Sequence, residues 1–197
     1  MSRPIAVAIT GGIGAGKSEA LAAFARHGAA TVSSDQIVHR LLRQDAGVRE
    51  ALLERFGEGI LDQANQIDRR AVAEIVFPDP EALDWLEGLL HPVVVREYLD
   101  WREQLGRLPN PPAVCVTEVP LLYEVGGQER FDAVVVVTAP AEVRAARARI
   151  QSELREPRLL PDEEKAAKAD YVYVNDGSLE ELDVFVAGVM DDLAGRG

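Results

Sequence analysis

The stretch "AITGGIGAGKSEA", residues 8–20, joins an apolar run to a glycine-rich loop and then to a helical pattern. Within it, the residues from Gly11 to Ser18 match the phosphate-binding pattern G-x-x-x-x-G-K-[ST]. Such a loop turns its backbone N–H groups toward phosphate oxygens, and the N-terminus of the following helix adds positive potential. The stretch therefore predicts a phosphate site between the first strand and the first helix of an α/β fold.

Individual residues of this loop have expected tasks. Lys17 supplies a mobile positive charge for β- and γ-phosphates, and the hydroxyl of Ser18 suits Mg²⁺. Glu19 is unexpected because a carboxylate repels phosphates, unless its side chain points to solvent at the start of the helix. The residues expected to form the cradle are Gly11, Gly12, Gly14, Ala15, Gly16, Lys17, Ser18 and Glu19.

Short and nearly continuous apolar runs alternate with helical patterns along the chain. Runs of this kind are typical of strands that are covered on both faces of a parallel sheet. The sequence therefore predicts an α/β protein with a five-stranded parallel sheet flanked by helices. The strands are expected at 4–10, 29–34, 113–119, 132–139 and 171–175.

Two segments depart from this alternation. About 80 residues separate the second and third expected strands, where a crossover helix needs only a dozen or so. Their patterns are helical, so we expect a helical insert at 38–111, including a helix that begins at Pro92. The polar, arginine-bearing residues 150–166 are expected to form a short lid. The remaining segments, 1–37, 112–149 and 167–197, form the predicted core.

Composition limits the classes of partner. The 197 residues are 47% hydrophobic, which is enough for one core with a small appended subdomain. A net charge of -12 argues against a broad basic surface for nucleic acid or an anionic membrane. The single cysteine, Cys115, excludes an intrachain disulfide and favours a reducing compartment. We expect a cytoplasmic protein with a small-molecule substrate and no nucleic acid, membrane or obligate protein partner.

Two carboxylates follow predicted strands. Ligands of an open parallel sheet bind beyond the carboxyl ends of its strands. Asp35 follows the second strand and Glu118 ends the third, so both should face the same crevice as Lys17. A carboxylate there can accept the proton of an attacking hydroxyl or hold a metal-bound water. Asp35 could also cap the next helix, and Glu118 could have an ordinary role at the end of its strand.

Six segments share their order and rough spacing with one known family, and together they cover almost the whole chain. They are "TGGIGAGKS", "SSDQIVHRLL", "DRRAVAEIVF", "LEGLLHPVV", "EVPLLYE" and "EEKAAKADYVYVNDG". This set resembles the dephospho-coenzyme A kinases, which are P-loop kinases. The resemblance implies that ATP, with Mg²⁺, phosphorylates the ribose 3′-hydroxyl of 3′-dephospho-coenzyme A, the last step of coenzyme A synthesis.

The resemblance also implies roles for single residues. Asp35 would be the catalytic base, Lys17 would act with the lid arginines Arg147 and Arg155, and Asn175 would lie near the adenine. For His91 a capping or core role is the alternative, and for Arg70 an ordinary role at the surface. The expected substrate-binding residues are Asp35, Arg69, Arg70, His91, Glu118, Pro120, Leu121 and Tyr123.

The chain departs from the family pattern at several positions. Ser33 replaces the first Asp of an Asp-x-Asp pair, and Glu19 stands where the family usually has Thr. Leu159 stands in place of a common Gln in a shortened lid, and Tyr123 in place of Phe. These departures leave the roles of the lid arginines less defined than the reaction.

Two other functions are compatible with parts of the pattern, and a third is disfavoured. A kinase for a nucleoside monophosphate or a sugar acid would share the architecture, and the departures would suit an inactive relative. A nucleotide-dependent switch generally carries an N/T-K-x-D stretch, and no Asn or Thr here precedes a lysine. Switches also carry a D-x-x-G stretch near the phosphate, and the only one in this sequence, Asp192 to Gly195, lies close to the C-terminal end. Both observations argue against a switch.

Overall fold

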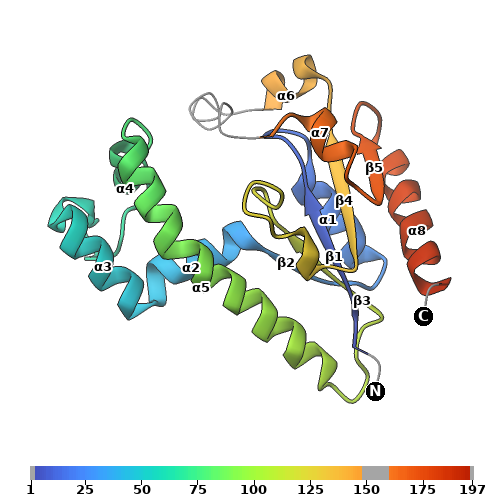
Figure 1. The fold of residues 1–197 in the computed structure, drawn as a ribbon, viewed down its shortest axis with the longest axis horizontal. Helices are drawn as coiled ribbons and strands as arrows, with labels where there is room; N and C mark the ends of the chain where they lie inside the picture. Colours follow the sequence, from blue (N-terminus) through green and yellow to red (C-terminus); the bar gives the residue numbers. More distant parts are fainter. Residues whose placement is uncertain (1–2, 148–159, 196–197) are drawn as a thin grey trace. The chain divides into compact units, whose positions relative to one another are not determined.

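The computed structural model describes residues 3–147 and 160–195, without the side chains of 145–147. Its centre is a five-stranded sheet in the order β2-β3-β1-β4-β5, in which every pairing is parallel (Figure 1). The predicted fold class is confirmed. The strands are β1 (Ile5–Thr10), β2 (Ala30–Ser33), β3 (Val114–Glu118), β4 (Ala133–Thr138) and β5 (Tyr171–Val174).

Both faces of the sheet are covered, which explains why its strands are apolar without interruption. Successive side chains of a strand point to opposite faces, so Val7 and Ile9 belong to one buried cluster and Ala8 to another. On the first face pack α1 (Lys17–Arg26) and α8 (Leu179–Gly195). On the second face pack the loop after β3 and the segment around α7 (Asp162–Ala166). The remaining elements of this unit are η2 (Gln128–Arg130) and α6 (Ala141–Arg147).

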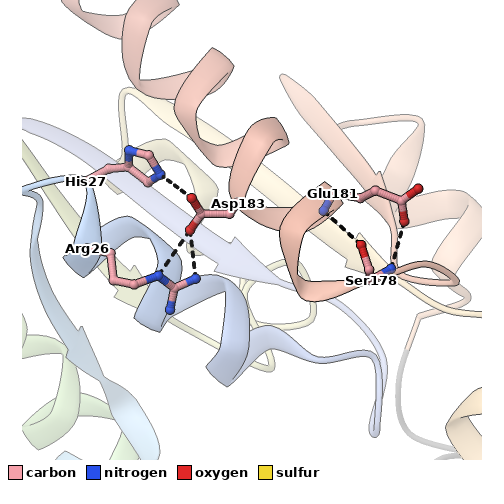
Figure 2. A network of polar contacts seen from close by, with 5 residues as sticks. All are labelled: Arg26, His27, Ser178, Glu181 and Asp183. Carbon is pink, nitrogen blue, oxygen red and sulfur yellow. Dashed lines mark hydrogen bonds and ion pairs between the residues drawn. The ribbon is translucent and has the colours of Figure 1, made fainter.

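Polar contacts join the two helices of the first face, and further contacts cap the N-terminus of α8 (Figure 2). Asp183 of α8 accepts hydrogen bonds from Arg26 at 2.8 Å and 3.1 Å and lies 3.0 Å from His27 Nε2. At the start of α8, Glu181 N donates to Ser178 Oγ while Ser178 N donates to the Glu181 carboxylate, which is a capping box. These contacts fix where α8 begins and how it lies on α1.

The chain divides into two compact units, Met1–Ser34 with Tyr98–Gly197 and Asp35–Glu97. The second unit is helical and has its own core, in which Leu52, Ile60 and Val76 are almost completely buried. Aspartate side chains cap two of its helices, since Asp45 accepts from Val48 N and Asp68 from Arg70 N. Its elements are α2 (Ser34–Gln44), α3 (Ala46–Phe56), η1 (Glu58–Ile60), α4 (Arg69–Val76) and the first part of α5 (Pro80–Gly106).

The prediction of a helix that begins at Pro92 is wrong. Pro92 lies inside α5, a single helix of 27 residues. A proline removes one helical hydrogen bond, but burial of Leu90 and Val94 on either side holds the helix together there. The proline at the first helical position is instead Pro80, preceded by Asp79, whose carboxylate accepts from two backbone N–H groups of the first turn.

The helical unit ends earlier than the predicted insert of 38–111, because the last part of α5 packs in the sheet unit. There the ring of Tyr98 lies 5.8 Å from that of Phe131, and Arg102 lies over both rings. Throughout the described residues, the helices are too short or too polar to span a bilayer.

Candidate nucleotide and acceptor site

The glycine-rich loop between β1 and α1 has the backbone that its glycines allow. Gly11 and Gly14 have φ values of 141° and 75°, which other residues rarely adopt. A side-chain carbon on Gly11 would lie 1.9 Å from the carbonyl oxygen of Val137 in β4, and one on Gly14 would lie 2.9 Å from the carbonyl oxygen of Arg144 in α6. Only glycine therefore lets the loop approach β4 and α6 this closely.

Three side chains of the predicted phosphate site lie at the start of α1, directly after the glycine-rich loop. Lys17 Nζ donates to the carbonyl oxygens of Gly12 at 2.9 Å and Gly11 at 3.2 Å, so its ammonium group lies along the loop. Ser18 and Glu19 are exposed. The Glu19 carboxylate therefore lies in solvent at a helix N-terminus, where negative charge is favourable.

The described residues include no group of three or more acidic, His or Cys side chains that could hold a metal ion. Mg²⁺ at nucleotide sites usually binds through one or two protein oxygens together with phosphates and water. The exposed hydroxyl of Ser18 is one such oxygen, so the residues present fit this kind of magnesium binding.

Asn175 is held at the phosphate loop by its hydrogen bonds, and its expected place near the adenine stays a prediction. Its side chain is buried, and its amide Nδ2 donates to the carbonyl oxygen of Ala15 at 2.8 Å. Its backbone N donates to Thr138 O at 2.7 Å, which fixes the residue at the end of β5. The amide group thus supports the phosphate loop, and this role was missed because no local pattern signals it.

The two carboxylates predicted to face the nucleotide lie where two strands end. Glu118 is buried as the last residue of β3, and its carbonyl oxygen accepts from Ser34 Oγ at 2.7 Å. Asp35 is exposed in the first turn of α2, which begins at Ser34. The alternative role of Asp35 as the cap of this helix is wrong, because the helix begins one residue earlier. A carboxylate in the first turn is nevertheless stabilised by the helix dipole.

Basic side chains gather on the helical unit around His39. Arg69 Nη1 lies 3.0 Å from His39 Nδ1, and Arg43 Nη1 lies 3.3 Å from His39 Nε2. Within the described part of the chain, neither arginine forms an ion pair with a carboxylate. We call Arg43, His39 and Arg69 the basic cluster. His39 lies in "SSDQIVHRLL", but its spacing alone did not mark it as a site residue.

Two other predicted acceptor residues of the helical unit have structural contacts. Arg70 is exposed and pairs with Glu74 one turn later, at 3.1 Å. His91 is half-buried in the middle of α5. Arg70 thus has the surroundings of the surface role considered for it, whereas a capping role for His91 is wrong, because α5 does not begin there. The contact of either residue with an acceptor stays a prediction.

The loop Pro120–Glu124, which we call the acceptor loop, follows directly after β3. Pro120 O accepts from Thr10 Oγ1 at 3.2 Å, Leu121 is half-buried and Leu122 is completely buried. Tyr123 packs on the apolar cluster beneath the loop, and burial raises the pKa of its phenol. Its hydroxyl makes no hydrogen bond within the described residues. The acceptor loop is thus held on the sheet by a hydrogen bond from β1 and by the packing of its apolar side chains.

The predicted lid is only partly covered by the described residues. Arg147 ends α6, with its side chain outside them, and Arg155 lies outside them altogether. Near the phosphate loop the structure places two residues that were not among the predicted site residues, Arg144 and Asp162. Their side chains approach to 3.9 Å, and both lie against the loop glycines.

A parallel sheet with a glycine-rich loop between its first strand and first helix, joined to a helical unit, defines a P-loop α/β fold. Comparison with known proteins agrees with this fold. A shikimate kinase from Bacteroides thetaiotaomicron has the same fold, with a TM-score of 0.53 at 16% identity, and 96% of this chain and 98% of that one are covered.

More similar proteins specify the family. The family model for dephospho-CoA kinase matches residues 5–181. The dephospho-CoA kinase of Protochlamydia amoebophila is 38% identical over 183 residues, covering 89% of this chain and 90% of the relative. A dephospho-CoA kinase structure from Campylobacter jejuni superposes with a TM-score of 0.72 at 25% identity, and 98% of each chain is covered. The chain belongs to the dephospho-CoA kinase family.

Proposed function

We propose that this protein transfers the γ-phosphate of ATP to the ribose 3′-hydroxyl of 3′-dephospho-coenzyme A, in the cytoplasm. The observation that carries the proposal is the phosphate loop, whose approach to β4 and α6 only glycine permits and whose lysine lies along it. Membership of the dephospho-CoA kinase family supports the choice of acceptor.

In the proposed reaction, the substrate 3′-oxygen attacks the γ-phosphorus while the bond from that phosphorus to the β–γ bridging oxygen breaks. Asp35 accepts the hydroxyl proton, and ADP leaves with the bridging oxygen. Backbone N–H groups of the loop and Lys17 neutralise charge on the phosphates. The Ser18 hydroxyl would hold Mg²⁺, which would supply further positive charge to the phosphates.

The acceptor side of the proposal rests on the helical unit and the acceptor loop. Dephospho-coenzyme A carries a diphosphate, and the basic cluster offers two guanidinium groups without a carboxylate partner among the described residues. Guanidinium groups bind phosphate oxygens through paired N–H donors. We assign residues 38–111 to acceptor binding, residues 150–166 to a lid, and Glu118 with Pro120, Leu121 and Tyr123 to the border of the acceptor pocket.

A panel of acceptors tests this function. ADP release is measured with 3′-dephospho-coenzyme A, AMP, thymidylate and gluconate at equal concentrations. We expect turnover with dephospho-coenzyme A and the formation of one coenzyme A for each ADP. Turnover with only one of the other three acceptors would assign the protein to a different substrate, and ADP release without any acceptor would contradict phosphoryl transfer to an alcohol.

A further inference from the structure

A lysine is completely buried in α7. The lysines of the chain are Lys17, Lys165 and Lys168, and of these Lys165 has 0% of its surface exposed. Its Nζ lies 2.8 Å from Glu124 Oε1, at the end of the acceptor loop. Moving an ammonium group out of water is costly unless an opposite charge accompanies it. The Glu124 carboxylate is that charge.

The same carboxylate holds a second group. Glu124 Oε1 also accepts a hydrogen bond from Leu160 N at 2.9 Å, just before α7. Its other oxygen, Oε2, is buried and makes no hydrogen bond among the described residues. Glu124 therefore ties the end of the acceptor loop both to the chain that enters α7 and to the middle of α7.

The helix that carries Lys165 also contacts the phosphate loop. Asp162 stands three residues before Lys165 and thus on the same side of the helix. A side-chain carbon on Gly12 would lie 2.9 Å from either carboxylate oxygen of Asp162, so this residue lies against the loop. One short helix thereby contacts the phosphate loop at its first residue and the acceptor loop one turn later.

We propose that Lys165 is a positioning residue, which acts through Glu124 to hold the acceptor loop in register with the phosphate loop. That the acceptor loop borders the bound acceptor rests on the proposed function. A buried ion pair is poor evidence for stability, because the cost of desolvation offsets most of the attraction. The pair does hold α7 and the end of the acceptor loop at a short distance, and in-line transfer requires the acceptor hydroxyl to be placed closely against the γ-phosphorus.

Two variants separate positioning from stability. Lys165→Met leaves the Glu124 charge buried without its partner, and we expect its Tm to fall by about 5–10 °C. The double variant Lys165→Met/Glu124→Met removes both charges, and we expect it to regain most of that Tm. In both variants we expect kcat/KM for dephospho-coenzyme A to stay about tenfold or more below the original, while KM for ATP changes by less than about threefold.

The control is Glu164→Met, which removes an exposed charge from the same short helix. We expect its Tm and kinetic constants to remain unchanged. If the double variant regains activity together with Tm, or does not fold, the pair serves structure alone and the proposal is overturned.

A measurement that needs no substrate tests the positioning role independently of which acceptor the protein uses. Hydrogen exchange of backbone amides is compared between the unmodified protein and the double variant. We expect faster exchange in a peptide that spans 118–126 and unchanged exchange in one that spans 8–20. Equal protection of the acceptor loop in both proteins overturns the positioning role, whereas failure of the acceptor panel overturns the proposed function and leaves this result standing.

Discussion

The side-chain amide of Asn175 donates a hydrogen bond of 2.8 Å to the main-chain carbonyl oxygen of Ala15, across a sequence separation of 160 residues. Both residues are buried, so water does not replace the bond easily. The end of β5 therefore holds the middle of the phosphate loop, and the shape of the loop depends on a residue far away in the sequence.

This bond predicts that Asn175 controls ATP binding without touching phosphate. Asn175→Ala leaves the buried Ala15 carbonyl without its donor, at a cost of about 1–3 kcal/mol. We expect the Kd of ATP, measured by calorimetry, to rise about tenfold. Asn175→Asp keeps the shape and removes the donor, so it should weaken ATP binding at least as much. ATP affinity that is unchanged in both variants would contradict the role of this bond.

The basic cluster predicts an effect on the acceptor alone. Arg69→Ala removes one guanidinium group from the cluster, and we expect KM for dephospho-coenzyme A to rise about tenfold with little change in KM for ATP. Arg49→Ala is the control, because Arg49 belongs to the same helical unit and lies 3.4 Å from Asn65 at the surface. Equal effects of the two substitutions would show that general charge, rather than the cluster, attracts the acceptor.

The burial of Cys115 predicts that its thiol is unreactive in the folded protein. It lies in β3 with 1% of its surface exposed, and burial raises the pKa of its thiol to about 11. Since the thiolate is the reactive form, we expect no reaction with a disulfide reagent at pH 8 over minutes. The same reagent should titrate one thiol in guanidinium chloride. Rapid reaction without denaturant would contradict the burial of β3.

Asp132 predicts a pH dependence of stability. A bidentate ion pair with Arg3 lowers the pKa of the Asp132 carboxyl below its ordinary 3.8, and a hydrogen bond from Ala6 N acts in the same direction. A lowered pKa in the folded state means that the contribution to stability is complete above the ordinary pKa. The contribution disappears as the pH falls through the lowered value.

Asp132→Asn should therefore destabilise the protein near pH 6 by about 1 kcal/mol or less, because the pair is partly exposed. Urea unfolding of the two proteins should converge as the pH falls below about 4. Asp191→Asn, which removes an exposed carboxylate from α8, should leave the free energy of unfolding unchanged at both pH values. A difference for Asp132→Asn that persists at low pH would rule out the ion pair as its cause.

The sheet could be predicted because its strands carry the signal locally. In β4, Val135 is buried on one face of the sheet and Val134 and Val136 on the other, and an uninterrupted apolar run records this directly. The phosphate loop is equally local, since its glycines and lysine are neighbours in sequence. The helix that runs through Pro92 was not predicted, because burial on either side outweighs the local preference of proline.

Contacts between distant residues could not be predicted. The bond of Asn175 to Ala15 and the pair of Lys165 with Glu124 depend on the order in which the strands assemble, which no local pattern encodes. Asn175 was identified as a site residue through the family resemblance, but its contact with the loop was not. His39 was visible in a quoted segment, yet only the fold places it between two arginines.

The central claim is that the phosphate loop and Asp35 act together on the 3′-hydroxyl of dephospho-coenzyme A, and the rate of coenzyme A formation by Asp35→Asn tests it most directly. The substitution keeps the size of the side chain and removes its ability to accept a proton. We predict a rate about 10²- to 10⁴-fold below that of the unmodified protein, with a Kd for ATP within about twofold. Nearly full activity of Asp35→Asn would contradict the claim.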